Sequence, residues 1–128
     1  MNISMDKLLV VGLGGFIGAA LRYAVSGATQ KTLGSFPVGT LLVNVAGGFL
    51  MGAIMETSAS VFPIPDNVRV FLTTGILGGL TTFSTFSYET VSYMTGGDYM
   101  MGGLNAGLNL VLALGACWVG RFAVQLLA

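Results

Sequence analysis

The chain has 128 residues, of which 54% are hydrophobic and only 8% are charged, and its mean hydropathy is +0.85. Soluble domains carry about a quarter charged residues, so a soluble fold of this size could not bury so much apolar surface, and we expect a bilayer as solvent. Five basic and five acidic residues exclude a basic nucleic-acid patch or a polybasic lipid anchor. The chain has no histidine and a single cysteine, which argues against zinc sites, disulfides and Cys–His or Ser–His catalysis.

Four apolar stretches follow one another, and each is long enough for the roughly 20 residues that cross a hydrocarbon core. They run from Leu8 to Val25, from Val38 to Ala59, from Val68 to Met94 and from Tyr99 to Leu127. The links 27–37, 60–67 and 95–98 are rich in turn-forming residues. Residues 1–128 are therefore predicted to form a single four-helix transmembrane channel domain, all-α, with both termini on one side.

Glycine is abundant, at 20 residues, and it recurs at a spacing of four residues on every predicted span. The pairs are Gly14/Gly18, Gly48/Gly52, Gly75/Gly79 and Gly103/Gly107. This spacing puts small residues on one face of a helix and allows close approach of a neighbouring helix. The pattern predicts a tightly packed bundle.

Basic residues are almost evenly divided between the two ends of the predicted bundle. Lys7, Arg69 and Arg121 fall at one end, and Arg22 and Lys31 at the other. Because an excess of Lys and Arg normally fixes orientation, this balance predicts insertion in both directions. Two oppositely inserted copies would form an antiparallel, dual-topology homodimer.

The third stretch has an unusual centre. Residues 73–87 contain three glycines and seven hydroxyl residues inside a predicted span. Broken backbone at membrane depth is tolerated only where protein or a watery cavity satisfies it, so we expect the third helix to be broken near its middle. Carbonyls freed between Gly75 and Thr82 would be hard oxygen ligands for a cation such as Na⁺. The alternative is a glycine kink whose carbonyls are satisfied by water.

Phe83 and Phe86 follow the glycines at a spacing that puts both rings on one helix face, and Thr82, Thr85 and Glu89 form an adjacent stripe. Aromatic ring edges are positively polarised, and hydroxyl groups can replace lost water around an anion. Conduction requires weak serial sites, which this combination would supply. Two phenylalanines at this spacing are by themselves also typical of core packing, but beside the glycine break, the hydroxyl groups and the carboxylate they favour a channel or transporter.

Other polar residues within the spans allow two interpretations each. Arg22 is either an interfacial anchor or an anion attractor at a vestibule. Asn44 either joins helices or donates N–H bonds to a passing anion. Asn105 and Asn109 share one helix face and either form a polar track or bond to neighbouring helices.

Three motifs occur in order along the chain. They are GGFIGAALRY from Gly14 to Tyr23, GTLLVN from Gly39 to Asn44, and GILGGLTTFSTFSYE from Gly75 to Glu89. With these motifs the sequence resembles the Fluc/CrcB family of small bacterial and archaeal fluoride channels, essentially from Lys7 to Leu127. The last motif is the most specific.

The resemblance implies a fluoride-selective channel that passes F⁻ passively and lowers cytoplasmic fluoride and its toxicity. It implies an antiparallel homodimer with two pores in a bacterial or archaeal plasma (inner) membrane. It assigns pore or anion-binding roles to Asn44, Phe83, Phe86, Thr85, Ser87, Asn105, Asn109, Arg22 and Glu89. The backbone carbonyls of Gly78 and Thr81 correspond to ligands of a central structural Na⁺ that is not transported. One departure is Ala113, where relatives carry serine.

The main alternative is a small dual-topology, proton-coupled multidrug exporter, which also uses four helices. Such a transporter needs an ionisable carboxylate in the middle of its first helix, and here the only candidate, Asp6, lies at the edge. A purely structural membrane subunit would not require hydroxyl groups beside a glycine break. An enzyme is not expected.

Overall fold

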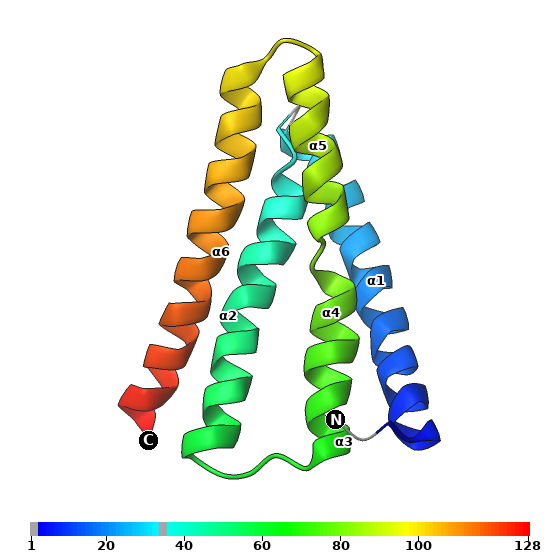
Figure 1. The fold of residues 1–128 in the computed structure, drawn as a ribbon, viewed down its shortest axis with the longest axis vertical. Coiled ribbons are helices and arrows are strands. Elements are labelled where there is room, and N and C mark those ends of the chain that lie inside the picture. Colours follow the sequence, from blue (N-terminus) through cyan, green and yellow to red (C-terminus); the bar gives the residue numbers. More distant parts are fainter. Residues whose placement is uncertain (1–2, 34–35) are drawn as a thin grey trace.

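The computed structural model describes residues 3–33 and 36–128, and the elements within these ranges are helices. In chain order they are α1 (Met5–Leu33), α2 (Val38–Ser60), α3 (Asp66–Val70), the π-helical η1 (Phe71–Leu77), α4 (Gly78–Leu80), α5 (Phe83–Thr95) and α6 (Tyr99–Leu127). They form an elongated bundle with both termini at one end and the α5–α6 turn at the other (Figure 1).

Among the described residues, four helical segments are long and apolar enough to cross a membrane, which agrees with the predicted number of spans. They are Met5–Gln30, Val38–Ser60, Asp66–Thr95 and Tyr99–Leu127. The third span is assembled from α3, η1, α4 and α5. The chain is thus an all-helical, multi-pass membrane protein.

The first helix is longer than the sequence pattern predicted. The segment after Gly27 was expected to be a link, yet α1 continues as far as Leu33. The Thr29 hydroxyl donates a 2.8 Å hydrogen bond to the Val25 carbonyl, and Gly27 lies in open space, so neither residue forces a turn. The next helix, α2, begins directly after Pro37, because the residue before a proline disfavours helical backbone and so separates the two helices. The end of apolar sequence was not the end of the helix.

Helices α2 and α6 touch backbone to backbone. A Cβ atom added at Gly48 would lie 2.7 Å from the Ala113 carbonyl oxygen, and one at Gly52 would overlap the Cys117 carbonyl. From the α6 side, a Cβ at Gly120 would overlap the Phe49 carbonyl. We call this contact the α2–α6 seam. It has no room for a side chain at any of the three glycines.

Helix α1 packs in the same way against the third span. A Cβ at Gly14 would lie 2.6 Å from the Phe71 carbonyl oxygen, and one at Gly18 would overlap the Ile76 carbonyl. Glycine at these positions is therefore a packing requirement, as predicted. The prediction is wrong for Gly103 and Gly107, which are exposed with no atom within 4 Å of an added Cβ.

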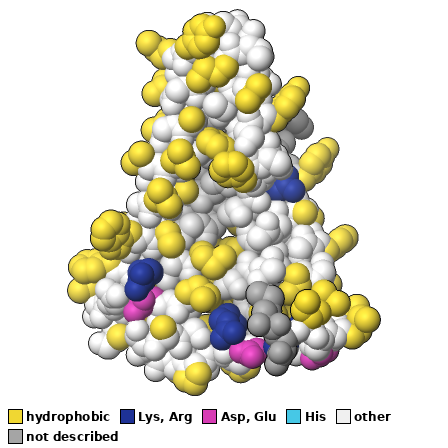
Figure 2. All heavy atoms as spheres, viewed as in Figure 1, with side chains coloured by type: hydrophobic (Ala, Val, Ile, Leu, Met, Phe, Trp, Pro, Cys, Tyr) yellow, Lys and Arg dark blue, Asp and Glu magenta, His cyan; other side chains and the backbone are white. Residues whose placement is uncertain are grey.

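The surface of one chain is strongly apolar. Trp118 and Phe83 are 78% and 73% exposed, whereas the buried large hydrophobic residues among those described are Val43, Leu77 and Phe86. In the view of Figure 2, charged side chains gather toward the end with the termini, apart from one Lys or Arg on the α1 side. This distribution suits a protein whose outer faces meet lipid or another protein.

Candidate functional site

The third span changes conformation between α4 and α5. Thr81 has φ −83° and ψ 156°, and Thr82 has φ −149° and ψ 121°, so both residues are extended. Figure 1 shows this as a thin segment between two stacked helices. The Thr82 hydroxyl accepts a 3.1 Å hydrogen bond from the Thr85 N–H and so caps α5.

The extended residues leave backbone carbonyls without their usual helical partners. The Thr82 N–H, which would bond to Gly78 in a continuous helix, donates instead to the Asn44 side chain at 2.9 Å. The Thr85 N–H, which would bond to Thr81, donates to the Thr82 hydroxyl. Within the described part of the chain, the Gly78 and Thr81 carbonyl oxygens therefore receive no hydrogen bond. Free carbonyls of this kind are oxygen ligands for a hard cation.

Arg22 lies on α1 and reaches the same region. Its Nε donates a 3.0 Å hydrogen bond to the Gly79 carbonyl oxygen, which would otherwise pair with a residue beyond the break. Neither interpretation from the sequence, an interfacial anchor or an anion attractor, included this contact. The structure makes Arg22 a brace between α1 and α4.

Asn44 bonds to both backbone groups of Thr82. Its Oδ1 accepts the Thr82 N–H at 2.9 Å, and its Nδ2 donates to the Thr82 carbonyl at 3.2 Å. The same Nδ2 donates to Asn109 Oδ1 at 2.9 Å. In this structure Asn44 therefore joins α2 to α6 and to the break, which is the first of its two interpretations.

Asn109 and Asn105 continue this chain of amides along α6. Asn109 Nδ2 donates to the Asn105 carbonyl at 2.9 Å and to Asn105 Oδ1 at 3.2 Å. Asn105 Nδ2 donates to the Thr90 hydroxyl on α5 at 3.1 Å. Asn105 is 0% and Asn109 4% exposed, so these polar groups are buried and hydrogen-bonded. The amide chain joins α2, α5, α6 and the break.

Phe83 and Phe86 form one aromatic pair at the start of α5. Their ring centroids are 5.3 Å apart and the planes are tilted by 52°. Phe86 is buried at 7% exposure, whereas Phe83 projects from the chain at 73%. Both line a cavity of about 320 Å³ that also includes Asn44 and Asn109. Ser87 turns back on its own helix, because its hydroxyl donates to the Phe83 carbonyl at 2.8 Å.

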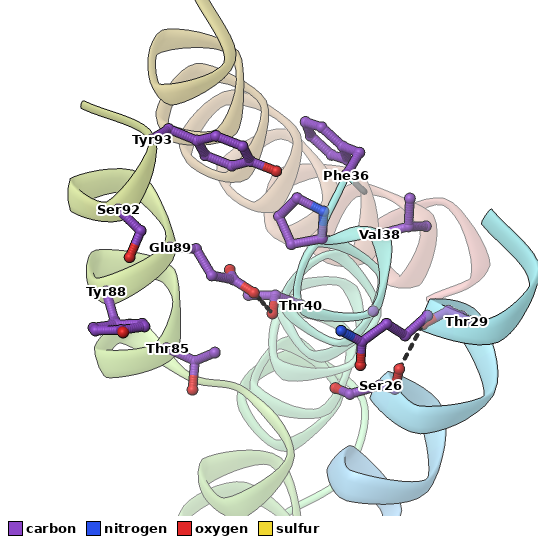
Figure 3. A pocket seen from close by; sticks show the side chains of 13 residues that line it. Ser26, Thr29, Phe36, Val38, Thr40, Thr85, Tyr88, Glu89, Ser92 and Tyr93 are labelled. Atoms are coloured by element: carbon purple, nitrogen blue, oxygen red, sulfur yellow. Dashed lines mark hydrogen bonds between the residues drawn. The ribbon is translucent and has the colours of Figure 1, made fainter. Parts of the chain in front are cut away.

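Glu89 lies in a second cavity, of about 550 Å³, between α1, α2 and α5. Figure 3 shows its carboxylate directed at Thr40, whose hydroxyl donates to Oε2 at 2.9 Å. The other oxygen, Oε1, is buried and has no hydrogen-bond partner among the described residues. Thr85 lines the same cavity from α5. The structure therefore divides six of the predicted pore residues between two cavities, whereas Arg22, Ser87 and Asn105 line neither of them.

Two residues of this region were missed at the level of sequence. Thr40 precedes Asn44 by one helical turn, so its place on the same face of α2 could have been recognised. Thr90 is the next residue after Glu89, and its Oγ1 accepts from Asn105. Hydroxyls at these positions are otherwise unremarkable in a membrane helix.

The fold and this site define a small multi-pass helical membrane protein with a buried amide and hydroxyl face beside an interruption of its third span. Residues 9–121 match the family described as "CrcB-like protein, Camphor Resistance (CrcB)". The chain belongs to this CrcB family.

Relatives cover nearly the whole chain. A "Fluoride-specific ion channel FluC" of Clostridium novyi (strain NT) is 50% identical over 121 residues, 91% of this chain and 94% of its own length. A protein with the same name from Clostridium perfringens (strain 13 / Type A) is 50% identical over 127 residues, 96% and 99% of the two chains. "Fluoride-specific ion channel FluC 1" of Methanosarcina acetivorans is 38% identical over 124 residues, 97% and 95% of the two. Since these relatives are ion channels, the expectation that the chain is not an enzyme is confirmed.

Proposed function

We propose that the chain is a fluoride-selective channel that passes F⁻ passively down its gradient. The observation that carries this proposal is 50% identity, over almost the full length, to proteins named fluoride-specific ion channels. The site is compatible with it, because amide, hydroxyl and aromatic groups meet beside the interrupted third span. Lowering cytoplasmic fluoride would reduce its toxicity.

The anion path runs along Phe83, Phe86 and the polar groups around them. The positively polarised ring edges attract an anion weakly, and hydroxyl and amide hydrogens replace its hydration water. Thr85, Ser87 and Glu89 follow the rings along α5, and Asn105 lies on α6 in the chain of amides that reaches Asn44. Weak contacts of this kind let an ion enter and leave, as conduction requires.

The two unpaired carbonyls, of Gly78 and Thr81, fit a structural Na⁺. Their helical donors are engaged elsewhere by Asn44 and Thr82. Gly78 is exposed on the surface of the single chain, so a second copy could approach it. Two carbonyls from each of two copies would give four oxygen ligands. When bound, the ion supplies positive charge that holds the copies together, and it is not transported.

The functional unit is an antiparallel homodimer with two pores. The near-even division of basic residues between the two ends supports insertion in both orientations. Phe83, at 73% exposure, needs a partner surface if it is to form one wall of a path. The interruption of the third span is then the crossing point of the two copies. The membrane is the plasma (inner) membrane of a bacterium or archaeon.

Liposomes that contain the purified protein test the proposal. Fluoride efflux that needs no proton gradient is the expected result, and Phe83→Thr is expected to slow it because a ring edge is lost. The matched control is Phe122→Thr on α6. Phe122 is 55% exposed and lies near the C-terminus, so this variant is expected to leave efflux unchanged. Proton-coupled export of organic cations, the activity of a multidrug exporter, would overturn the proposal.

The structural ion has its own test. Replacing Na⁺ on both sides with N-methyl-D-glucamine is expected to slow fluoride efflux or dissociate the dimer, while no Na⁺ flux is seen. Measurable ²²Na⁺ movement through the protein would contradict a structural role.

Cross-linking of vesicle-reconstituted protein is expected to trap dimers with opposite orientations, and exclusively parallel dimers would contradict dual topology.

A further inference from the structure

Asn44 has no free amide hydrogen. A side-chain amide carries two N–H groups. The Nδ2 atom of Asn44 already donates to the Thr82 carbonyl at 3.2 Å and to Asn109 Oδ1 at 2.9 Å. An anion can therefore bind this amide only by displacing one of these two acceptors.

The two acceptors are not equivalent. The Thr82 carbonyl belongs to extended backbone that Asn44 also holds through the Thr82 N–H, so its displacement would disturb the break itself. Asn109 Oδ1 is a side-chain atom. Turning this amide leaves the backbone of the break in place, although it disturbs the two bonds from Asn109 Nδ2 to Asn105 that fix its resting direction. Of the two bonds, the one to Asn109 is thus the one that an anion can replace without disturbing the backbone of the break.

The space around this bond cannot widen easily. Asn44, Gly48 and Gly52 succeed one another by single helical turns on α2, and their partners Asn109, Ala113 and Cys117 do the same on α6. One turn further along both helices, Arg121 on α6 forms an ion pair with Glu56 on α2, in which Arg121 Nε donates to Glu56 Oε2 at 3.0 Å. These four contacts, called the rungs of the α2–α6 seam, hold both helices at one separation.

We propose that Asn109 Oδ1 occupies an anion position at rest, and that fluoride takes its place on Asn44 Nδ2. This inference rests on the proposed fluoride channel and assigns Asn109 as its size-determining residue. A fluoride ion is close in size to the amide oxygen that it replaces, whereas chloride is larger. Because the glycine rungs fix the separation of α2 and α6, the gap between Asn44 Nδ2 and the displaced Asn109 amide keeps the size of one amide oxygen. The larger anion fits the cavity of about 320 Å³ beside this gap but is excluded from the gap itself.

Shortening Asn109 or spreading the seam removes this discrimination. Asn109→Ser withdraws the amide oxygen and enlarges the space beside Asn44. Gly48→Ala puts a methyl group 2.7 Å from the Ala113 carbonyl oxygen, so the helices must part. A size-matched pocket discriminates by about 10–200-fold per small group, so the fluoride-to-chloride efflux ratio is expected to fall at least about tenfold in each variant.

The test compares paired fluoride and chloride efflux from liposomes that contain the full chain. Asn67→Ser and Gly107→Ala are the matched controls, since Asn67 bonds to Asp6 at the exposed end and an added Cβ at Gly107 meets no atom. Both controls are expected to keep the wild-type ratio. If Asn109→Ser still conducts fluoride and its fluoride-to-chloride ratio is unchanged, the inference about Asn109 is overturned. If the wild-type protein shows no fluoride efflux, the proposed function itself is overturned.

A measurement on the wild type decides the matter if Asn109→Ser does not fold. Solid-state NMR detects the contact between the Asn44 side-chain nitrogen and the Asn109 side-chain carbonyl carbon. The contact is expected without fluoride and is expected to weaken at saturating fluoride. Its persistence at full strength, with fluoride bound and conducted, would overturn the displacement.

Discussion

The α2–α6 seam and the α4–α5 break both involve α2, yet they are stabilised in opposite ways. At the seam, the backbones touch through Gly48, Gly52 and Gly120, and each helix keeps its own hydrogen bonds. At the break, the backbone at Thr82 depends on the Asn44 side chain for its partners. The seam therefore resists any added atom, whereas the break depends on particular polar groups being present.

The difference teaches where rigidity and polarity come from in so small a membrane protein. Lipid offers no hydrophobic drive for helix association, so close glycine contacts give the seam its cohesion. Unpaired backbone groups at membrane depth cost several kcal/mol, so the break depends on the side chains of Asn44 and Arg22, which bond to Thr82 and to the Gly79 carbonyl. Asn44 belongs to both regions, since it is the first rung of the seam and the brace of the break.

The largest effect is expected from breaking the seam with Gly52→Val. The new side chain would overlap the Cys117 carbonyl, and because the clash is with backbone the two helices cannot close, so the cost exceeds the ~1–3 kcal/mol of ordinary overpacking and we expect folding to fail. Thermal unfolding in detergent measures the loss. Gly107→Val carries the same change of helix propensity with no overlap, so equal destabilisation of the two variants would contradict the packing explanation.

The next largest effect is expected from Asn44→Leu at the break. The variant leaves three groups without their hydrogen-bond partner: the Thr82 N–H, the Thr82 carbonyl and Asn109 Oδ1. Each unsatisfied buried group costs about 1–3 kcal/mol. A lower unfolding temperature and a loss of fluoride efflux are both expected. Asn67→Leu, which loses one exposed bond, is the control, and a wild-type melting curve for Asn44→Leu would refute the bracing role.

A smaller effect is expected from Arg22→Met, which keeps most of the side-chain length but removes the donor to the Gly79 carbonyl. Loss of one hydrogen bond from a charged group destabilises by about 1.5–3 kcal/mol. Arg69→Met is the comparison, because Arg69 pairs at 2.9 Å with a largely exposed Asp66 and such pairs contribute about 0–1 kcal/mol. Equal melting temperatures for the two variants would mean that Arg22 does not brace the break.

The smallest effect is expected from Thr82→Val, which removes the cap of α5. Loss of an N-cap acceptor costs about 1 kcal/mol, and the shape of the side chain is kept. Thr95→Val is the control, because the Thr95 hydroxyl is exposed and bonds back to its own helix at 3.0 Å. Hydrogen exchange at the Thr85 amide reports the cap directly, because this N–H donates to the Thr82 hydroxyl. The same protection in Thr82→Val and the wild type would contradict a capping role for Thr82.

Periodicity and composition predicted the helices and the residues that share a face. The four spans follow from apolar length, and the contact of Phe83 with Phe86 follows from their spacing of three residues. The close packing of Gly14 and Gly18 follows from small residues one turn apart. These are properties of a single helix, which a sequence carries locally.

Partners across helices could not be predicted in the same way. Asn44 meets Asn109, and Glu56 meets Arg121, because α2 and α6 run parallel with a constant offset of 65 residues. That register results from the packing of glycines on both helices, and no local pattern encodes it. The exposed pair Gly103/Gly107 has the same spacing as the packed pairs, so spacing alone could not identify the outer face of α6. The contact of Arg22 with Gly79 likewise depends on where α1 crosses the third span.

The most direct test of the central claim is fluoride and chloride efflux recorded together, with two ion-selective electrodes, from vesicles that contain the wild-type protein and both salts. The account predicts rapid fluoride efflux with chloride retained at the level of protein-free vesicles, because the polar face beside the break accepts the smaller anion. Equal efflux of both anions, or retention of both, would contradict it.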